Sequence, residues 1–509
     1  MAAPKISLPD FLQRSGADTI VDELRTGFTS KNKTLVVSDV TDAQGHQYVD
    51  LVQEGGGVLG IALIGYTYVL EKMGIRFFSM AGTSAGSINA MLLACAGNKE
   101  EEKSTIIAGH LVKLDMFSFV DGKSGNWKFT KWIKKIIQKT LLGNNVIKRI
   151  SRFVAWTIFL LLLLTISCFI INFIWPGIAK WIGVVAGGTL ILLTGLIIFL
   201  LKKFKQFSKN GYGLNEGKSF HEWINKVIAT FHVQGDATKN VITNYADFSC
   251  HFMRVPAEMK VKDDPRRSNN RPPYMPMLTL ITCDIIAERK IEFPQMWDLY
   301  WDKEENVKPG DFVRASMSIP VFFETYSLSG IRTKSSFATW DKHLNWQNEQ
   351  KDIPDKVQFI DGGTLSNFPI NVFYNASYPV PRMPTFGIRL QDGVLDEANR
   401  SNNSFFRYIA SLFATIRFNF DRDFTTRNRA YNMGVKTIDV QEHSWLNFFM
   451  KDDERVELFK KGAKAAAEFL KEFDWELYKT NRLKNHEIQK ERFDNPNNME
   501  VFPYSEIPV

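Results

Sequence analysis

The chain has 509 residues, of which 45% are apolar and 13% aromatic, and it carries 63 Lys and Arg against 55 Asp and Glu. This apolar content supplies a sizeable core and excludes global disorder, and the length allows one large domain with an insertion or a small second domain. The four cysteines are widely spaced without C-x-x-C or metal-ligand spacing, so we expect reduced thiols, no metal and no cofactor.

The N-terminal segment, residues 1–44, carries mixed charge and weak periodicity, which predicts a variable helical piece. Its first residues show no apolar run of the kind that a secretory signal peptide contains. We therefore expect no cleavable signal peptide.

A run of glycines follows an apolar stretch at residues 48–52. It consists of Gly55, Gly56 and Gly57, and Val58 comes next. Backbone N–H groups without side chains beside them can crowd against a tetrahedral intermediate and hold its oxyanion. We predict that residues 55–58 form an oxyanion hole.

A second glycine motif, Gly82-Thr83-Ser84-Ala85-Gly86, lies between an apolar run at 77–81 and another at 88–96. A G-x-S-x-G sequence between a strand and a helix is a nucleophile elbow, whose tight turn needs small flanking residues. The turn presents the serine at a helix N-terminus, where developing negative charge is favoured. Either motif alone could serve an ordinary turn, but in this order they favour a serine acyl hydrolase with Ser84 as its nucleophile.

Residues 121–212 form a basic insertion. Fourteen Lys and Arg and no Asp or Glu lie between residues 122 and 215. Between residues 129 and 141, apolar residues recur at three- and four-residue spacing and lysines occupy the other face. This pattern predicts an amphipathic helix on an anionic membrane surface or, alternatively, a surface helix packed on the catalytic domain.

Two uncharged apolar runs follow, at about 153–175 and 181–201. Each is long enough to cross a bilayer as a helix, which predicts a transmembrane hairpin; the alternative is a pair of buried core helices. Of the fourteen basic residues only Lys180 lies in the turn, so the positive-inside rule predicts an integral membrane protein with its catalytic domain on the cytoplasmic side. Without these fourteen the chain has 49 basic and 55 acidic residues, so we expect an anionic membrane partner and no nucleic acid.

A serine nucleophile needs a general base that accepts its proton. The chain has eight histidines, and none lies in a recognisable catalytic context. Asp361 follows a strand-like run at 357–360 and precedes Gly362 and Gly363. Ligands and catalytic groups gather at the C-terminal ends of strands in open α/β sheets, so Asp361 is our candidate base. The alternative is an ordinary Asp-Gly turn.

These blocks resemble the patatin-like phospholipase family, which pairs Gly-Gly-Gly-x-Arg/Lys-Gly with Gly-x-Ser-x-Gly, an Ala-Ser-x-Ser-x-Pro block and a later Asp-Gly-Gly or Asp-Gly-Ala. Residues 315–320 match the third block. The resemblance implies a three-layer α/β/α sandwich with a mainly parallel central sheet, and a Ser–Asp dyad of Ser84 and Asp361. The catalytic domain would comprise 45–120 and 213–480, followed by an extended tail at 481–509. The wall of the site would contain Ser316, Ser318, Pro320, Gly362 and Gly363.

One position departs from the family pattern, because Leu59 stands where an Arg or Lys is usual. A cation there would stiffen the loop or attract an anionic headgroup, so we expect Leu59 to reduce turnover or shift substrate choice.

The function that we expect is that of a membrane-anchored serine acyl hydrolase. It would cleave fatty-acyl esters of phospholipids or lysophospholipids through an acyl-enzyme. An acyltransferase could use the same acyl-enzyme, and Leu59 favours a third alternative, a weakly active membrane scaffold or effector. A Ser–His–Asp hydrolase is a more distant alternative.

Overall fold

The computed structural model describes residues 6–119, 211–234, 240–267, 273–349, 351–391 and 419–494, together with single helical positions between 156 and 205 and at 412 and 415. Its contacts divide the chain into two compact units. The first comprises Met1–Asp121 and Gly217–Val509, and the second comprises Gly122–Glu216.

In the second unit, the described residues form strand β4 (Gly213–Asn215) and the single helical positions between 156 and 205. Large apolar side chains at these positions are exposed, namely Trp156, Phe159, Leu163, Ile166, Ile170 and Ile198. Within the described residues, no helix is both long and apolar enough to cross a membrane. The predicted amphipathic helix at 129–141 lies outside the described residues, as do most positions of the predicted spans at 153–175 and 181–201.

A central sheet organises the first unit, with the strand order β12-β11-β2-β3-β6-β10-β9. Five neighbouring strands are parallel: β12 (Val435–Asp439), β11 (Thr385–Gln391), β2 (Gln47–Gln53), β3 (Ile75–Thr83) and β6 (Leu278–Asp284). Antiparallel strands are β10 (Lys356–Asp361), β9 (Tyr326–Ser329), β7 (Arg289–Phe293), β1 (Val40–Thr41) and β5 (Lys260–Val261). The predicted α/β fold with a central sheet is confirmed, but only the five neighbouring strands from β12 to β6 are parallel, and the sheet as a whole is mixed.

The direction of strand β10 differs from the one that the sequence analysis assumed. Asp361 ends this strand as expected, but β10 runs antiparallel to β6, so its end does not lie at the C-terminal edge of the parallel strands by direction alone. The position of Asp361 is set instead by the pairing register between β10 and β6. Asp361 pairs with Thr282, and Thr83, the residue before Ser84, pairs with Ile281. Ser84 and Asp361 therefore lie at the same level on either side of β6.

The main hydrophobic core lies between the sheet and a group of packed helices. Helix α3 (Gly60–Lys72) packs against α15 (Asp452–Glu472). The two backbones approach closely because Gly462 has no side chain: a Cβ there would lie 1.9 Å from the carbonyl oxygen of Ala62. Helix α4 (Ala85–Cys95) follows Ser84 and buries nearly every residue.

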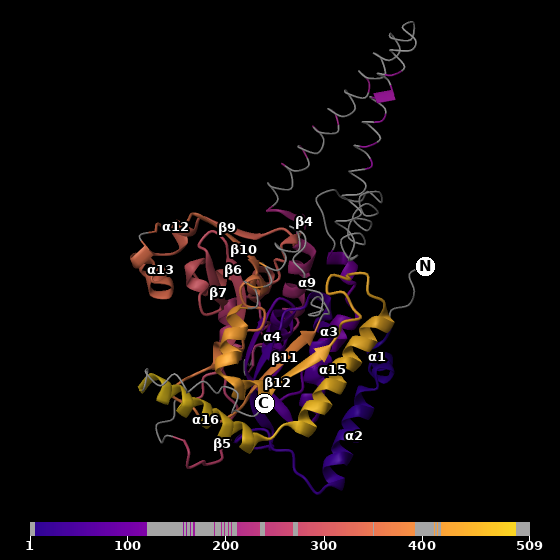
Figure 1. Cartoon of the computed structure of the whole chain (residues 1–509), viewed down its shortest axis with the longest axis vertical. Helices are drawn as coiled ribbons and strands as arrows, with labels where there is room; N and C mark the ends of the chain where they lie inside the picture. Colours follow the sequence, from indigo (N-terminus) through magenta and orange to yellow (C-terminus); the bar gives the residue numbers. More distant parts are fainter. Residues whose placement is uncertain are drawn as a thin grey trace. The chain divides into compact units, whose positions relative to one another are not determined.

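The N-terminal segment is helical, as predicted. Helix α1 (Leu8–Ser15) begins after Ser7, whose hydroxyl accepts a hydrogen bond from a backbone N–H of the first turn, and α2 (Ala17–Ser30) follows after Gly16 at a φ of 65°. Both helices pack on α15, and Figure 1 shows them along the outer side of that helix. This contact buries Phe11 against Phe459 of α15.

The second face of the sheet carries a smaller cluster that includes Val52, Ala81 and Tyr431. The covering segments are η8 (Ile370–Phe373) and η10 (Arg429–Gly434), and α16 (Trp475–Asp494) packs on η10. Figure 1 shows α16 passing below the ends of β11 and β12.

Helix α16 contradicts the prediction of an extended tail from residue 481. Its polar composition gave no helical signal, but long-range contacts order it. Tyr478, Arg482 and Asn485, at helical spacing, are all buried. Tertiary packing thus overrides the local preference of the sequence.

The remaining elements of the first unit connect these layers. They are η1 (Gly57–Leu59), α5 (Ser104–Val112), η2 (Met116–Phe119), α9 (Lys218–Ile228), α10 (Tyr245–Phe252), η4 (Trp297–Leu299), η5 (Glu304–Asn306), α11 (Pro309–Ser316), β8 (Val321–Phe323), α12 (Ile331–Lys334), α13 (Phe337–Leu344), η6 (Trp346–Glu349) and η7 (Gly362–Thr364).

Candidate active site

Ser84 occupies a strained turn between β3 and α4. Its φ of 52° and ψ of −119° lie in a region that residues with side chains rarely adopt. The turn is also crowded: a Cβ on Gly82 would lie 2.4 Å from the backbone of Gly86, and a Cβ on Gly86 would lie 2.3 Å from the carbonyl oxygen of Gln53. The backbone thus has the geometry of a nucleophile elbow, in which Gly82 and Gly86 cannot carry side chains.

The block at 315–320 borders Ser84. The Ser84 N–H donates to Oγ of Ser316 over 3.0 Å, and that hydroxyl donates to the carbonyl oxygen of Ile281 over 2.6 Å. The Ser84 hydroxyl donates to the thioether sulfur of Met317 over 3.2 Å. A thioether is a weak acceptor, so this contact leaves the hydroxyl easy to redirect. Pro320, by contrast, is exposed.

Asp361 reaches the same region from β10. Its N–H donates to the carbonyl oxygen of Ser318 over 2.9 Å, and its Oδ1 accepts from the N–H of Gly363 over 2.8 Å. Gly362 packs on the Ile281 carbonyl, since a Cβ there would lie 2.1 Å from that oxygen. The same carbonyl accepts the Ser316 hydroxyl, so Ser84 and the Asp361 turn rest on one peptide group of β6. At the backbone they are two strand spacings, about 10 Å, apart.

The glycine loop packs directly on the elbow. A Cβ on Gly55 would lie 3.1 Å from Cβ of Ser84, and the Gly55 N–H donates to the carbonyl oxygen of Asn367 over 3.0 Å. Gly56 and Gly57 donate no backbone hydrogen bond to the described residues. These two N–H groups are therefore available to an oxyanion.

Val58 differs from its neighbours in the loop. Its N–H donates to the carbonyl oxygen of Trp445 over 3.0 Å. A Cβ on Gly57, which has a φ of +56°, would lie 2.2 Å from the same oxygen. The segment at 442–450 therefore lies against the loop and occupies one of the four predicted donors.

Asn367 joins the two halves of the site, and the sequence analysis missed it. Its Nδ2 donates to Glu54 over 3.2 Å and to the Gly55 carbonyl over 3.1 Å. Its Oδ1 lies 2.5 Å from where a Cβ on Gly55 or on Gly363 would be. A lone asparagine six residues after Asp361 gave no chemical signal, because only the fold brings it between the glycine loop and the aspartate turn.

Leu59, the departure from the family pattern, has no exposed surface and belongs to the main core. Its side chain points away from water, so this position supplies no surface charge. A cation here would need a different packing of the loop on the helices.

An apolar cavity of about 60 Å³ adjoins the elbow. Gly57 and Val58 of the glycine loop, Ala85 of the elbow and Met317 are among its lining residues. The rest of the wall is apolar and comes from Ile61, Ile64, Ile88, Leu111, Leu114, Met116, Phe119, Phe220, Trp223 and Phe448, with Gly60 and Asn89. Such a wall suits a hydrocarbon chain.

No histidine is among the hydrogen-bond partners of Ser84 in the described part of the chain. His46, His221 and His343 instead pair with aspartates, Asp42, Asp311 and Asp298 respectively. A His–Asp pair is itself part of a Ser–His–Asp triad, so what disfavours that alternative is the absence, within the described residues, of a hydrogen bond between Ser84 and a histidine.

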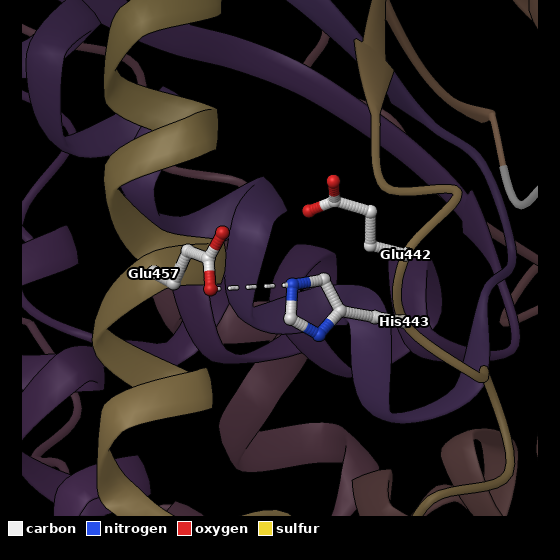
Figure 2. A group of neighbouring side chains, drawn as sticks. All are labelled: Glu442, His443 and Glu457. Atoms are coloured by element: carbon white, nitrogen blue, oxygen red, sulfur yellow. Dashed lines mark ion pairs between the residues drawn. The ribbon is translucent and has the colours of Figure 1, made fainter.

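One group of side chains could offer ligands to a metal ion. The ligand atoms of Glu442, His443 and Glu457 lie within 4.8 Å of one another. Figure 2 shows Glu457 on α15 facing His443 in the loop after β12, where their ion pair spans 3.8 Å. Lys461 lies 3.4 Å from Glu442 and competes with a cation for that carboxylate. These ion pairs account for the group without a metal.

Comparisons with known proteins found similarities in sequence and in structure. The family model described as patatin-like phospholipase matches residues 51–374. An uncharacterized protein of Bacillus subtilis, YqhO, is 40% identical over 87 residues, which are 17% of this chain and 30% of that protein. VipD from Legionella pneumophila aligns in structure over 91% of this chain and 81% of its own, with 12% identity and a TM-score of 0.36.

Proposed function

Because the chain belongs to the patatin-like phospholipase family, whose members are lipid acyl hydrolases, we propose that it cleaves fatty-acyl esters of phospholipids or lysophospholipids with Ser84 as nucleophile and Asp361 as base. The observation that carries the proposal is the register across β6, which brings the strained elbow and the aspartate turn to one level. The apolar cavity beside Ala85 and Met317 supports a fatty-acyl substrate.

The reaction would begin with a rotation of the Ser84 hydroxyl away from Met317. Asp361 takes the hydroxyl proton while Oγ attacks the ester carbonyl, and the N–H groups of Gly56 and Gly57 hold the resulting oxyanion. Collapse of the tetrahedral intermediate expels the alcohol, which receives the proton from Asp361. Water then attacks the acyl-enzyme, with Asp361 again taking and returning a proton, and the fatty acid leaves.

The cavity in its present form holds only a few methylene groups, because its volume is about 60 Å³. A long acyl chain would therefore require side chains of the wall, such as Phe119 and Trp223, to move. Those residues come from η2 and α9, on either side of the basic insertion in sequence.

We also propose that the insertion attaches the enzyme to a membrane, with the catalytic unit on the cytoplasmic side. The support is the sequence: two uncharged runs at 153–175 and 181–201, flanked by basic residues. Resistance of the protein to carbonate extraction, with protease access to the catalytic unit only from the cytoplasmic side, is the expected result. Release by carbonate would contradict it.

The decisive experiment incubates the full-length protein with mixed phospholipid vesicles and quantifies free fatty acid and lysolipid by mass spectrometry. We expect release by the wild type and a loss of about 10³-fold or more in Ser84→Ala and Asp361→Asn. Ser30→Ala, at an exposed helix end, is the matched control. Equal release by Ser84→Ala and the wild type would refute the proposal, and fatty acyl appearing on an added lysolipid would redirect it to acyl transfer.

A further inference from the structure

A second cavity, of about 570 Å³, lies in the first unit and shares no lining residue with the apolar cavity or the candidate active site. Asp50 of β2 and Ser79 of β3 line it from the sheet. The segment at 372–383, the ends of the loop around 266–277, and Arg482 of α16 supply most of the remaining wall. This cavity is therefore separate from the candidate active site, although β2 and β3, which line it, also lead to the glycine loop and to Ser84.

Positive charge predominates in its wall, where four arginines face a single acidic residue, Asp50. Two of the arginines are neutralised within the protein. Arg266 pairs with Asp264 and Glu476, and Arg267 pairs with Asp39. Arg382 lies over the ring of Tyr274 at 4.4 Å.

Arg482 is the unusual member of this set. Its exposed fraction is only 7%, yet no carboxylate of the described residues forms an ion pair with it. Its guanidinium lies 4.1 Å from the ring centroid of Tyr431, and one of its five N–H groups donates to the hydroxyl of Tyr478 over 3.2 Å. Within the described part of the chain, these aromatic residues are its partners.

A buried guanidinium without a counter-charge is unfavourable, because removing it from water costs several kcal/mol that only an anion or further hydrogen bonds offset. The planar fork of arginine matches the paired oxygens of a phosphate or carboxylate. A phosphate, with a charge between −1 and −2 at neutral pH, would offset the buried charge of Arg482 and offer paired oxygens to its N–H groups.

Asp50 opposes an anion only weakly. The loss of water around it raises the pKa of its carboxyl to about 7, so a large part of the population is uncharged at neutral pH. Arg382 and the hydroxyl of Ser79 act in the other direction but do not overcome this effect. The remainder of the wall includes Phe78, Tyr274, Phe373, Tyr374 and Tyr378, which suit the organic part of a ligand.

We propose that this cavity binds an organic phosphate, with the phosphate group on Arg482 and the organic part against the surrounding aromatic rings. The site is distinct from the one that holds the acyl ester and does not depend on Ser84 being a nucleophile. The phosphate belongs either to a soluble metabolite or to a lipid headgroup, and both present the same group to the arginine.

The test measures binding to the full-length protein. Inorganic phosphate, glycerol 3-phosphate and adenosine monophosphate are titrated by calorimetry, and vesicles with and without phosphatidic acid are tested by cosedimentation. The variants are Arg482→Gln, which removes the charge, and Arg482→Lys, which keeps the charge but loses the fork. Arg427→Gln, at an exposed arginine paired with Asp423, is the matched control.

We expect at least one probe to bind the wild type and the control equally. Arg482→Gln should bind it at least tenfold more weakly, and Arg482→Lys should fall between them. Binding of soluble phosphates assigns the ligand to a metabolite, and binding confined to phosphatidic acid vesicles assigns it to a headgroup. The proposal is overturned if no probe binds the wild type, or if Arg482→Gln binds as tightly. Neither result depends on hydrolytic activity. A failure of this proposal can therefore be distinguished from a failure of the proposed role of Ser84.

Discussion

At the scale of single residues, the backbone constrains this protein most at the elbow. Ser84 holds a positive φ, and a Cβ added to Gly82 or Gly86 would lie within 2.5 Å of backbone atoms. Strain of this kind persists only where the surroundings enforce it, and here α4 and β3 are both almost completely buried. Polar groups buried near the site are also held in place, because each buried donor or acceptor needs a hydrogen-bond partner.

Leu59 gives a stability prediction at this scale. Restoring the usual cation with Leu59→Arg places a guanidinium in the main core, so we expect the free energy of unfolding to fall by about 3 kcal/mol or more. Leu59→Met, which keeps an apolar side chain of similar volume, should cost less than about 1.5 kcal/mol. Denaturant titration of both variants measures the difference, and equal stabilities would show that the loop can turn this side chain outward.

Asp50 gives a pH dependence. Its pKa of about 7 in the folded protein exceeds the ordinary value of 3.8, so the folded state binds more protons between these values than the unfolded state does. The contribution of Asp50 to stability is therefore present at low pH and is lost as the pH rises from about 4 to 7, by no more than about 4 kcal/mol. Asp50→Asn should remove this part of the pH dependence. Parallel stability curves for the two proteins from pH 4 to 8 would contradict it.

At the scale of elements, the site is built by segments that are distant in sequence. Strand β3 delivers Ser84, β10 delivers Asp361, and the segment after β12 delivers the Trp445 carbonyl to the N–H of Val58. A substrate oxygen cannot use that N–H while the carbonyl accepts from it. The segment at 442–450 therefore withholds the N–H of Val58 from the proposed oxyanion hole unless it moves.

Phe448 holds this segment in place, since its ring stacks on Phe322 at 4.5 Å and lines the apolar cavity. We expect Phe448→Ala to loosen the segment and to raise the rate at which a fluorophosphonate labels Ser84 by about two- to tenfold. Phe337→Ala, at an exposed phenylalanine of α13, is the control for general loss of an aromatic ring. A slower reaction of Phe448→Ala would mean that the segment supports the site instead of obstructing it.

The sequence predicted those elements whose signals are local. The glycine loop and the elbow are recognisable because close backbone approach and a positive φ restrict residues 55–57 and 82–86 to small side chains. The direction of β10, the helical state of residues 481–494 and the role of Asn367 were not predictable. Each depends on contacts between segments far apart in the sequence, such as Thr282 with Asp361, Asn428 with Asn485 and Glu54 with Asn367.

At the scale of the whole molecule, the chain leaves its catalytic unit at residue 121 and re-enters it at residue 217. Each unit has its own set of internal contacts. We expect that replacing residues 122–212 by a flexible linker leaves the thermal unfolding of the catalytic unit and the labelling of Ser84 within about twofold of the wild type. The same change should abolish sedimentation with vesicles. Loss of labelling in a folded variant would show that the insertion completes the site.

The strand order has one further consequence, for proteolysis. Strands β2 and β3 precede the insertion but lie between β11 and β6, which follow it. A protease that cuts within residues 122–212 would produce two fragments whose strands are interleaved in one sheet. Ser84, the proposed nucleophile, would belong to one fragment and Asp361, the proposed base, to the other, and hydrogen bonding across the sheet would keep the two associated. Nicking would thus separate the chain covalently while the enzyme stays assembled.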